Sequence, residues 1–220
     1  MTKNISAKKL QALKHATILA TYLLIVWGFY RFLVKLPDEI EELVIKPILW
    51  LLPVVYLVRK EGGGLASVGI TKKNLFPAVY LSLALGILFL AEALLINYLK
   101  YQSFSFAANI GNLPFFTALG LSFATAFTEE ITFRGYLFNR VWYAIDNELV
   151  ANLSTSIIWA LIHVPVSIFV WKLSFSASLI YLLLTTLFGI GAAFVFARTK
   201  NVFSSILLHV MWEWPIILFR

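Results

Sequence analysis

Several ionisable side chains lie inside the long apolar stretches of this sequence, where each charge costs a few kcal/mol on insertion scales. They are Glu92, Glu129, Glu130, Arg134, His163, His209 and Glu213. Carboxylates and imidazoles are the groups that most often take a proton from water in hydrolytic sites, and they also bind zinc. The chain has no cysteine, which excludes thiolate catalysis, disulfides and cysteine zinc sites. These residues therefore predict acid–base or metal-assisted chemistry inside a set of apolar segments.

The two adjacent acids at positions 129 and 130 are expected to behave differently. Glu130 and Arg134 are four residues apart, so they share a helix face and can form an ion pair. Glu129 lies about 100° further around the helix, where Thr132 and Phe133 offer no cation. An unpaired, poorly solvated carboxylate suits a general base near neutral pH. The alternative is that both acids cap a helix at the headgroup layer.

The two intramembrane histidines lie on two further predicted helices. His163 is flanked by apolar residues, and His209 shares a helix face with Glu213, four residues later. Each histidine has a structural alternative, namely a hydrogen bond within packed helices. At about 1.5 Å per residue, however, Glu129, His163 and His209 fall at comparable depth on three helices. Because buried polar groups need partners, we expect these three side chains to meet in one cavity.

The composition is that of a membrane protein. Apolar residues make up 60% of the chain, charged residues 13%, and the mean hydropathy is +0.85. Soluble domains average about 45–50% apolar and about 25% charged residues, so a soluble enzyme and a disordered linker are disfavoured. The net charge of +7 comes from Lys and Arg spread between apolar runs, which is typical of membrane topology, so no nucleic-acid partner is expected.

The apolar runs set the expected fold, because a helix needs roughly 20 apolar residues to cross the hydrocarbon core. The sequence predicts an all-α polytopic transmembrane bundle, with residues 1–220 forming a single integral membrane domain. Seven spans are expected, or eight if 38–58 or 98–112 contributes a further short segment. The predicted spans are 16–34, 44–58, 77–97, 113–133, 151–171, 176–197 and 202–219.

The distribution of Lys and Arg predicts a cytoplasmic N-terminus. Most of them then fall on the inner side, and the acidic cluster at 38–42 falls outside with a minority of the cations, including Arg31 and Lys46. The glycine-rich turn at 61–64 is expected to be a flexible inner linker. His15, in the basic N-terminal stretch, is expected to be solvated or at the headgroups.

The order and spacing of the motifs resemble a known family. Glu-Glu-x-x-x-Arg at 129–134, Trp159-x-x-x-His163, Phe188-Gly189 and His209-x-x-x-Glu213 follow one another as in the CAAX prenyl protease and bacteriocin-processing (CPBP, or Abi) family. The likeness covers about residues 113–213. It implies an all-helical intramembrane peptidase in the cell membrane, with its site open to the cytoplasmic side. The implied substrate is a peptide, including prenylated or otherwise lipidated peptides.

The resemblance also implies a role for each matched residue. Glu129 would activate the attacking water, His163 would help to hold that water, and Glu130 with Arg134 would form a supporting pair.

His209 and the residue at position 213 would stabilise the oxyanion. Position 213 departs from the pattern, because prenyl proteases usually carry Asn there and Glu213 donates a hydrogen bond only when it is protonated. Position 159 is Trp in place of the commoner Phe, which is a milder change.

Two alternatives to a glutamate-type peptidase with no cofactor remain open. In the first, Glu129, His163 and His209 hold a catalytic zinc ion with one open position, although the sequence has no HExxH motif. In the second, the chain is a non-catalytic immunity or adaptor protein that binds a peptide or a membrane partner, which the altered position 213 favours. Transport is weaker, because the acids are few and paired repeats with broken helices are not evident.

Overall fold

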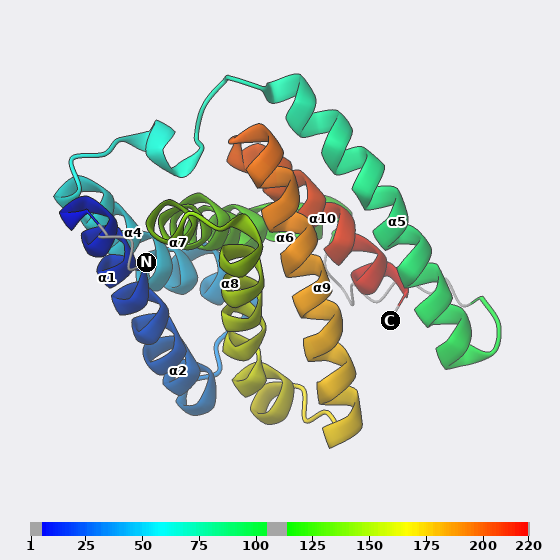
Figure 1. Cartoon of the computed structure of the whole chain (residues 1–220). Coiled ribbons are helices and arrows are strands. Elements are labelled where there is room, and N and C mark those ends of the chain that lie inside the picture. Colours follow the sequence, from blue (N-terminus) through cyan, green and yellow to red (C-terminus); the bar gives the residue numbers. More distant parts are fainter. Residues whose placement is uncertain (1–5, 105–113, 220) are drawn as a thin grey trace.

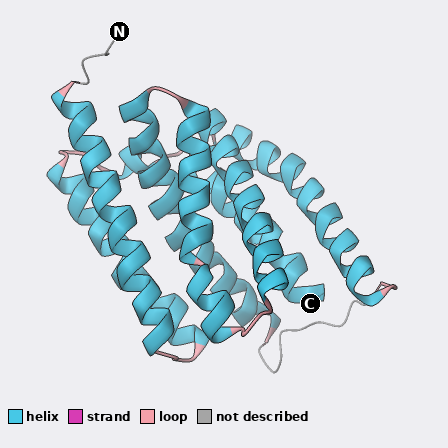
Figure 2. Ribbon diagram, turned by 60° about the horizontal axis from the view of Figure 1, so that its bottom comes forward, coloured by secondary structure: helices cyan, strands magenta, loops and turns pink. Residues whose placement is uncertain are grey.

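The structure is a computed structural model that describes residues 6–104 and 114–219, with side chains described up to Glu213. Every regular element in these two ranges is helical, as Figure 2 shows. The expected all-α fold is therefore confirmed. That the chain forms a single domain stays a prediction.

The N-terminal part of the chain folds into two long helical stretches that are interrupted by π-turns. The first comprises α1 (Ala7–Tyr22), η1 (Leu23–Trp27) and α2 (Gly28–Leu33), and Ser6 caps its start by accepting a hydrogen bond from Lys9 N. The second begins after Pro37 and comprises α3 (Asp38–Ile40), η2 (Glu41–Ile45) and α4 (Lys46–Lys60). The short helix η3 (Leu65–Val68) follows in the connection to the next long helix.

The rest of the bundle begins with the long helix α5 (Leu75–Tyr101), drawn at the edge of the molecule in Figure 1. Asn147 and Ser174 are N-caps, and Asp146 and Lys200 end helices in the left-handed conformation. The remaining elements are α6 (Phe115–Glu130), the π-helix η4 (Ile131–Phe138), α7 (Asn139–Ile145), α8 (Glu148–Ile162), η5 (Val166–Val170), α9 (Phe175–Thr199) and α10 (Val202–Phe219).

Four helical stretches in the described ranges are long and apolar enough to cross a membrane: Ala7–Leu33, Leu75–Tyr101, Glu148–Val170 and Phe175–Thr199. These features are those of an integral membrane protein. A shorter apolar helix covers Val202–Glu213. The predicted spans at 44–58 and 113–133 also fall on helices, but α4 and α6 are shorter and carry buried charges. The count of seven spans therefore stays a prediction.

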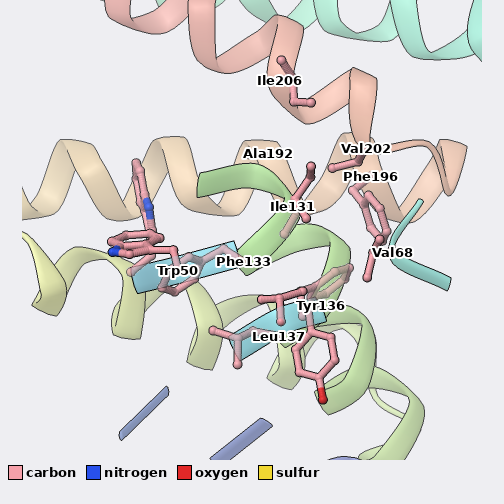
Figure 3. Close-up of a cluster of buried hydrophobic side chains, with 14 of the residues drawn as sticks. Trp50, Val68, Ile131, Phe133, Tyr136, Leu137, Ala192, Phe196, Val202 and Ile206 are labelled. Atoms are coloured by element: carbon pink, nitrogen blue, oxygen red, sulfur yellow. The ribbon is translucent and has the colours of Figure 1, made fainter. Parts of the chain in front are cut away.

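The core joins helices from both halves of the chain (Figure 3). Trp50 of α4 packs on Phe133 of η4, with 5.7 Å between ring centroids, and Phe196 of α9 lies 6.0 Å from Phe138. Helix α10 packs against α5, α6 and α9, and α8 runs along α9. Large apolar side chains on the outer face of α5 are exposed, including Phe76, Ile87 and Leu88, as a lipid-facing surface requires.

A buried polar cluster ties together the end of the bundle where α4 stops. Glu61 accepts hydrogen bonds from Tyr136 Oη (2.6 Å) and Arg140 Nε (2.7 Å) and lies 2.9 Å from His15 Nδ1. Burial would raise the pKa of the Glu61 carboxyl, but these hydrogen bonds hold it below its usual value. The expectation of a solvated His15 is therefore wrong, because this side chain is buried and its partner Glu61 lies 46 residues away. Glu61, the first residue of the predicted linker, is held by these contacts, and the flexibility of the rest of the linker stays a prediction.

Candidate active site

Glu129 lies at the end of α6 and is 4% exposed. Its Oε1 accepts a hydrogen bond from Lys46 Nζ (3.0 Å), and its Oε2 accepts one from the indole Nε1 of Trp159 (2.9 Å). His163 Nε2 lies 3.9 Å from the same Oε2. The carboxylate is thus held at both oxygens, and one imidazole nitrogen faces it beyond direct hydrogen-bonding distance.

Glu130 forms the second half of the cluster and is fully buried. Its Oε1 accepts from Arg134 Nη1 (2.9 Å) and lies 2.7 Å from His209 Nδ1. The predicted ion pair between Glu130 and Arg134 is therefore confirmed. Within the described residues, Glu130 Oε2 and Arg134 Nη2 have no hydrogen-bond partner. Unsatisfied charged atoms in an interior are costly, so these two mark a place where further polar groups are accommodated.

His163 is positioned by the end of its own helix. The regular helix α8 ends at Ile162, and His163 lies at a turn in the helical stretch just before Pro165, which has no N–H to donate to the carbonyl four residues earlier. His163 Nδ1 lies 2.7 Å from the carbonyl oxygen of Trp159, and a carbonyl only accepts, so this nitrogen carries the hydrogen. The neutral ring then presents the lone pair of Nε2 toward Glu129.

Aromatic rings surround these polar groups. The Trp159 ring lies between the two imidazoles, 4.7 Å from His163 and 5.7 Å from His209 between centroids. The guanidinium of Arg134 lies over the face of Trp159 at 4.7 Å. Such rings exclude water, and electrostatic interactions are stronger in the resulting low-dielectric space.

A cleft of about 560 Å³ lies beside this cluster, between the start of α4 with η2, the middle of α6 and the start of α10. Its lining is mostly apolar and includes Leu51, Phe127 and Ile206. Glu42 and Thr128 also line it. Both adjoin the site, because Glu42 accepts a hydrogen bond from Lys46 and Thr128 directly precedes Glu129 in the sequence. The cleft therefore brings an apolar surface next to the carboxylate cluster.

Comparison with known proteins agrees with the motifs in the second half of the chain. Residues 111–215 match the family model described as type II CAAX prenyl endopeptidase Rce1-like. This part of the chain is similar to the Rce1-like family. The resemblance predicted from the motifs at 129–134, 159–163 and 209–213 is thereby confirmed. No curated protein and no solved structure matches the sequence significantly.

For the motif residues, one prediction and one structural alternative are wrong. Glu129 is not unpaired, because Lys46 reaches it from η2 and α4, 83 residues earlier in the chain. His209 does not bond Glu213, although both lie on α10. His209 turns to Glu130, and Glu213 instead accepts a hydrogen bond from Ser122 Oγ of α6 (2.5 Å).

Sequence reasoning also missed Lys46 and gave Trp159 too little weight. Lys46 was expected on the outer side of the membrane, yet its side chain is only 6% exposed and lies in the site. Nothing local to Glu129 signals this contact. Glu92, on α5, forms no ion pair with Arg134 in the part of the chain that the structure describes, because Arg134 pairs with Glu130. Its half-buried carboxyl has no hydrogen bond within the described residues.

The zinc alternative finds no ready ligand set. Across residues 6–104 and 114–213, no three His, Asp or Glu side chains are grouped so that they could hold a metal ion. His209 Nδ1 is bonded to Glu130 and not to Glu129. Zinc dependence nevertheless remains a prediction for elemental analysis to decide.

Proposed function

We propose that this chain is an intramembrane endopeptidase of the CAAX type, in which Glu129 and His163 activate a water molecule. The observation that carries the proposal is the 3.9 Å separation between Glu129 Oε2 and His163 Nε2. Both atoms are acceptors when the imidazole is neutral. A water that donates to two acceptors at about 2.7 Å each, with roughly 90–105° between the two bonds, joins atoms about 3.8–4.3 Å apart, so this gap suits one water held by both residues.

The reaction follows from the charges of the cluster. Glu129 takes a proton as the water oxygen attacks the peptide carbonyl, and the same proton passes to the leaving amine when the C–N bond breaks. His209 is the proposed donor to the oxyanion, through Nε2 of its doubly protonated form, since Nδ1 is bonded to Glu130. Glu130 and Arg134 hold that imidazole in place. Glu213, bonded to Ser122, is left with a supporting role.

The substrate class is a peptide with a lipidated or strongly apolar segment. The family implies a peptide or prenylated protein substrate. The apolar cleft next to Glu42 and Thr128 supports this assignment, because an isoprenoid or an apolar side chain would be removed from water there.

The test is cleavage of a prenylated CAAX peptide by the purified protein in detergent or lipid nanodiscs. Glu129→Gln and His163→Ala are expected to lower kcat by about 10²–10⁴-fold, the usual contribution of a general base. Glu92→Gln is the matched control, since it removes a carboxyl from a membrane helix away from the cluster, and it should retain wild-type activity. Full activity of Glu129→Gln would overturn the proposal.

A non-catalytic adaptor or immunity protein is the second candidate, and the carboxylate at position 213 is the observation that favours it. In that case binding or protection survives Glu129→Gln, and no peptide is cleaved by the wild-type chain. A zinc-dependent peptidase would instead contain stoichiometric zinc that tracks with activity.

A further inference from the structure

Lys46 is a buried cation whose ammonium group is surrounded by carboxylates and aromatic rings. It is the first residue of α4, and its side chain is 6% exposed. Its Nζ contacts Glu42 Oε2 (2.5 Å) and Glu129 Oε1 (3.0 Å). The rings of Trp27 and Trp50 lie 5.6 and 5.9 Å from the same nitrogen. Two carboxylates and two indole faces thus surround one ammonium group.

Such an arrangement is stable only when all its members are present. A lone ammonium in an apolar interior is very costly, whereas a paired one with aromatic neighbours is tolerated. The converse holds for the acids: without Lys46, Glu129 and Glu42 would lose the cation they share, and Glu129 would remain next to Glu130. The ion pair therefore decides whether Glu129 is accommodated as a carboxylate.

The geometry of Glu129 also depends on Lys46. The ammonium holds Oε1 while the Trp159 indole holds Oε2, so the plane of the carboxylate is fixed by two donors on opposite sides. That orientation is what presents Oε2 toward His163. Loss of either donor frees the carboxylate to rotate about its terminal torsion, which is broad for Glu side chains.

We propose that Lys46 is a positioning residue for Glu129, supplied by the part of the chain before the Rce1-like region at 111–215. It keeps the carboxylate charged and oriented toward the water that His163 helps to hold. The catalytic effect of Lys46 rests on the proposed function, because it requires the chain to be a peptidase. The contact itself is independent of activity.

The kinetic test compares Lys46→Met, which keeps the side-chain length and removes the charge, with Lys46→Arg, which keeps the charge. We expect Lys46→Met to lower kcat by about tenfold or more, up to the roughly 10²–10⁴-fold expected for loss of the base itself, with KM within about twofold. Lys46→Arg should recover a clear part of that loss. The matched control is Arg31→Met, which breaks the neighbouring buried pair between Arg31 and Glu41 without touching Glu129 and should leave kcat unchanged.

Three results would overturn the proposal. If kcat of Lys46→Met is unchanged, Lys46 does not position Glu129. If kcat increases, Lys46 inhibits Glu129 instead of supporting it. An equal loss in Arg31→Met assigns the effect to general destabilisation of the N-terminal helices.

A thermal-unfolding cycle in detergent separates this inference from the proposed function. Lys46→Met, Glu129→Gln and the double variant are compared by their apparent Tm. Because Lys46→Met leaves the buried Glu129 carboxylate without its cation, and Glu129→Gln removes that carboxylate, the double variant should unfold at a higher temperature than additive single effects allow. Additive shifts would contradict the contact even in an active protein. If the variants show strong coupling but the wild-type protein cleaves no peptide, the peptidase proposal is contradicted, while the contact by which Lys46 holds Glu129 is supported.

Discussion

Trp159 connects more of the site than any role in packing requires. Its indole N–H donates to Glu129, its carbonyl oxygen orients His163, and its ring face lies under the guanidinium of Arg134. A phenylalanine at this position would supply the ring and the carbonyl and would lack the N–H. The indole nitrogen is therefore a specific feature of this chain, and its effect on Glu129 is separable from packing.

We expect Trp159→Phe to lower kcat by about tenfold or more, because a hydrogen bond to a charged group contributes about 1.5–3 kcal/mol. The KM should change little, since the ring that packs against the neighbouring helices is kept. Steady-state kinetics on the prenylated peptide measures both constants. Trp212→Phe is the control: Trp212 is stacked on Phe188 (4.5 Å between centroids) and contributes no hydrogen bond to Glu129. Equal losses in the two variants would assign the effect to packing alone.

Residue contacts could be predicted from the sequence where they are local. Glu130 and Arg134 are four residues apart on one helix turn, and helix geometry alone predicted their pairing. The same rule failed for His209 and Glu213, because Glu130 of another helix offers His209 a closer partner. The bond between Lys46 and Glu129 spans 83 residues and depends on how the helices pack, which residue spacing does not encode.

Close packing of α8 against α9 holds the two motif-bearing helices beside η4. Gly189 of α9 faces Ser156 of α8, and a β-carbon at position 189 would lie 2.9 Å from Ser156 Cβ and 3.2 Å from Arg134 Nη2. The small residue at position 189 thus permits a close approach of the two helices. A change in the distance between these helices would therefore move the guanidinium of Arg134, which pairs with Glu130.

Gly189→Ala is expected to destabilise the protein by about 1–3 kcal/mol, the usual cost of overpacking, and to lower kcat through displacement of Arg134. Thermal unfolding in detergent and peptide cleavage measure the two effects. Gly120→Ala provides the matched control, because a β-carbon there meets no atom within 4 Å and alanine favours the helix. A Gly189→Ala protein as stable as Gly120→Ala would contradict the packing argument.

Hydropathy predicted those helices well whose sequences are apolar along their whole length. The long helices α5 and α9 lie where their apolar runs predicted. The segment at 38–58 was harder, since η2 and α4 carry buried charged residues whose partners lie on other helices. The π-turns at η1, η2 and η4 have no signal in the hydropathy pattern, because they arise from local packing.

At the scale of the whole molecule, the structure changes which charges bear on membrane orientation. Arg31 and Lys46 had been placed on the outer side, but Arg31 pairs with Glu41 and Lys46 with Glu42 and Glu129. Buried pairs do not face the aqueous phases, so they carry little weight in the positive-inside rule. The same reasoning removes Arg134 from the predicted inner side, because it is buried against Glu130. The remaining cations still favour the inner side, and the cytoplasmic N-terminus stays a prediction.

That orientation can be tested across one helix, because the chain has no cysteine of its own. Helix α5 separates Lys72 from Ser103, and both residues are exposed in the structure. With the N-terminus in the cytoplasm, a membrane-impermeant maleimide added to intact cells should label Ser103→Cys and spare Lys72→Cys until the cells are permeabilised. The reverse pattern would place the N-terminus outside, and labelling of both variants in intact cells would mean that α5 does not cross the membrane. The labelling also shows on which side of the membrane the cleft beside Glu129 lies. Asn201, before α10, donates hydrogen bonds to the carbonyls of Thr71 and Lys73, before α5, so the starts of these two helices lie at the same end of the bundle. Thr71 and Asn201 both line the cleft.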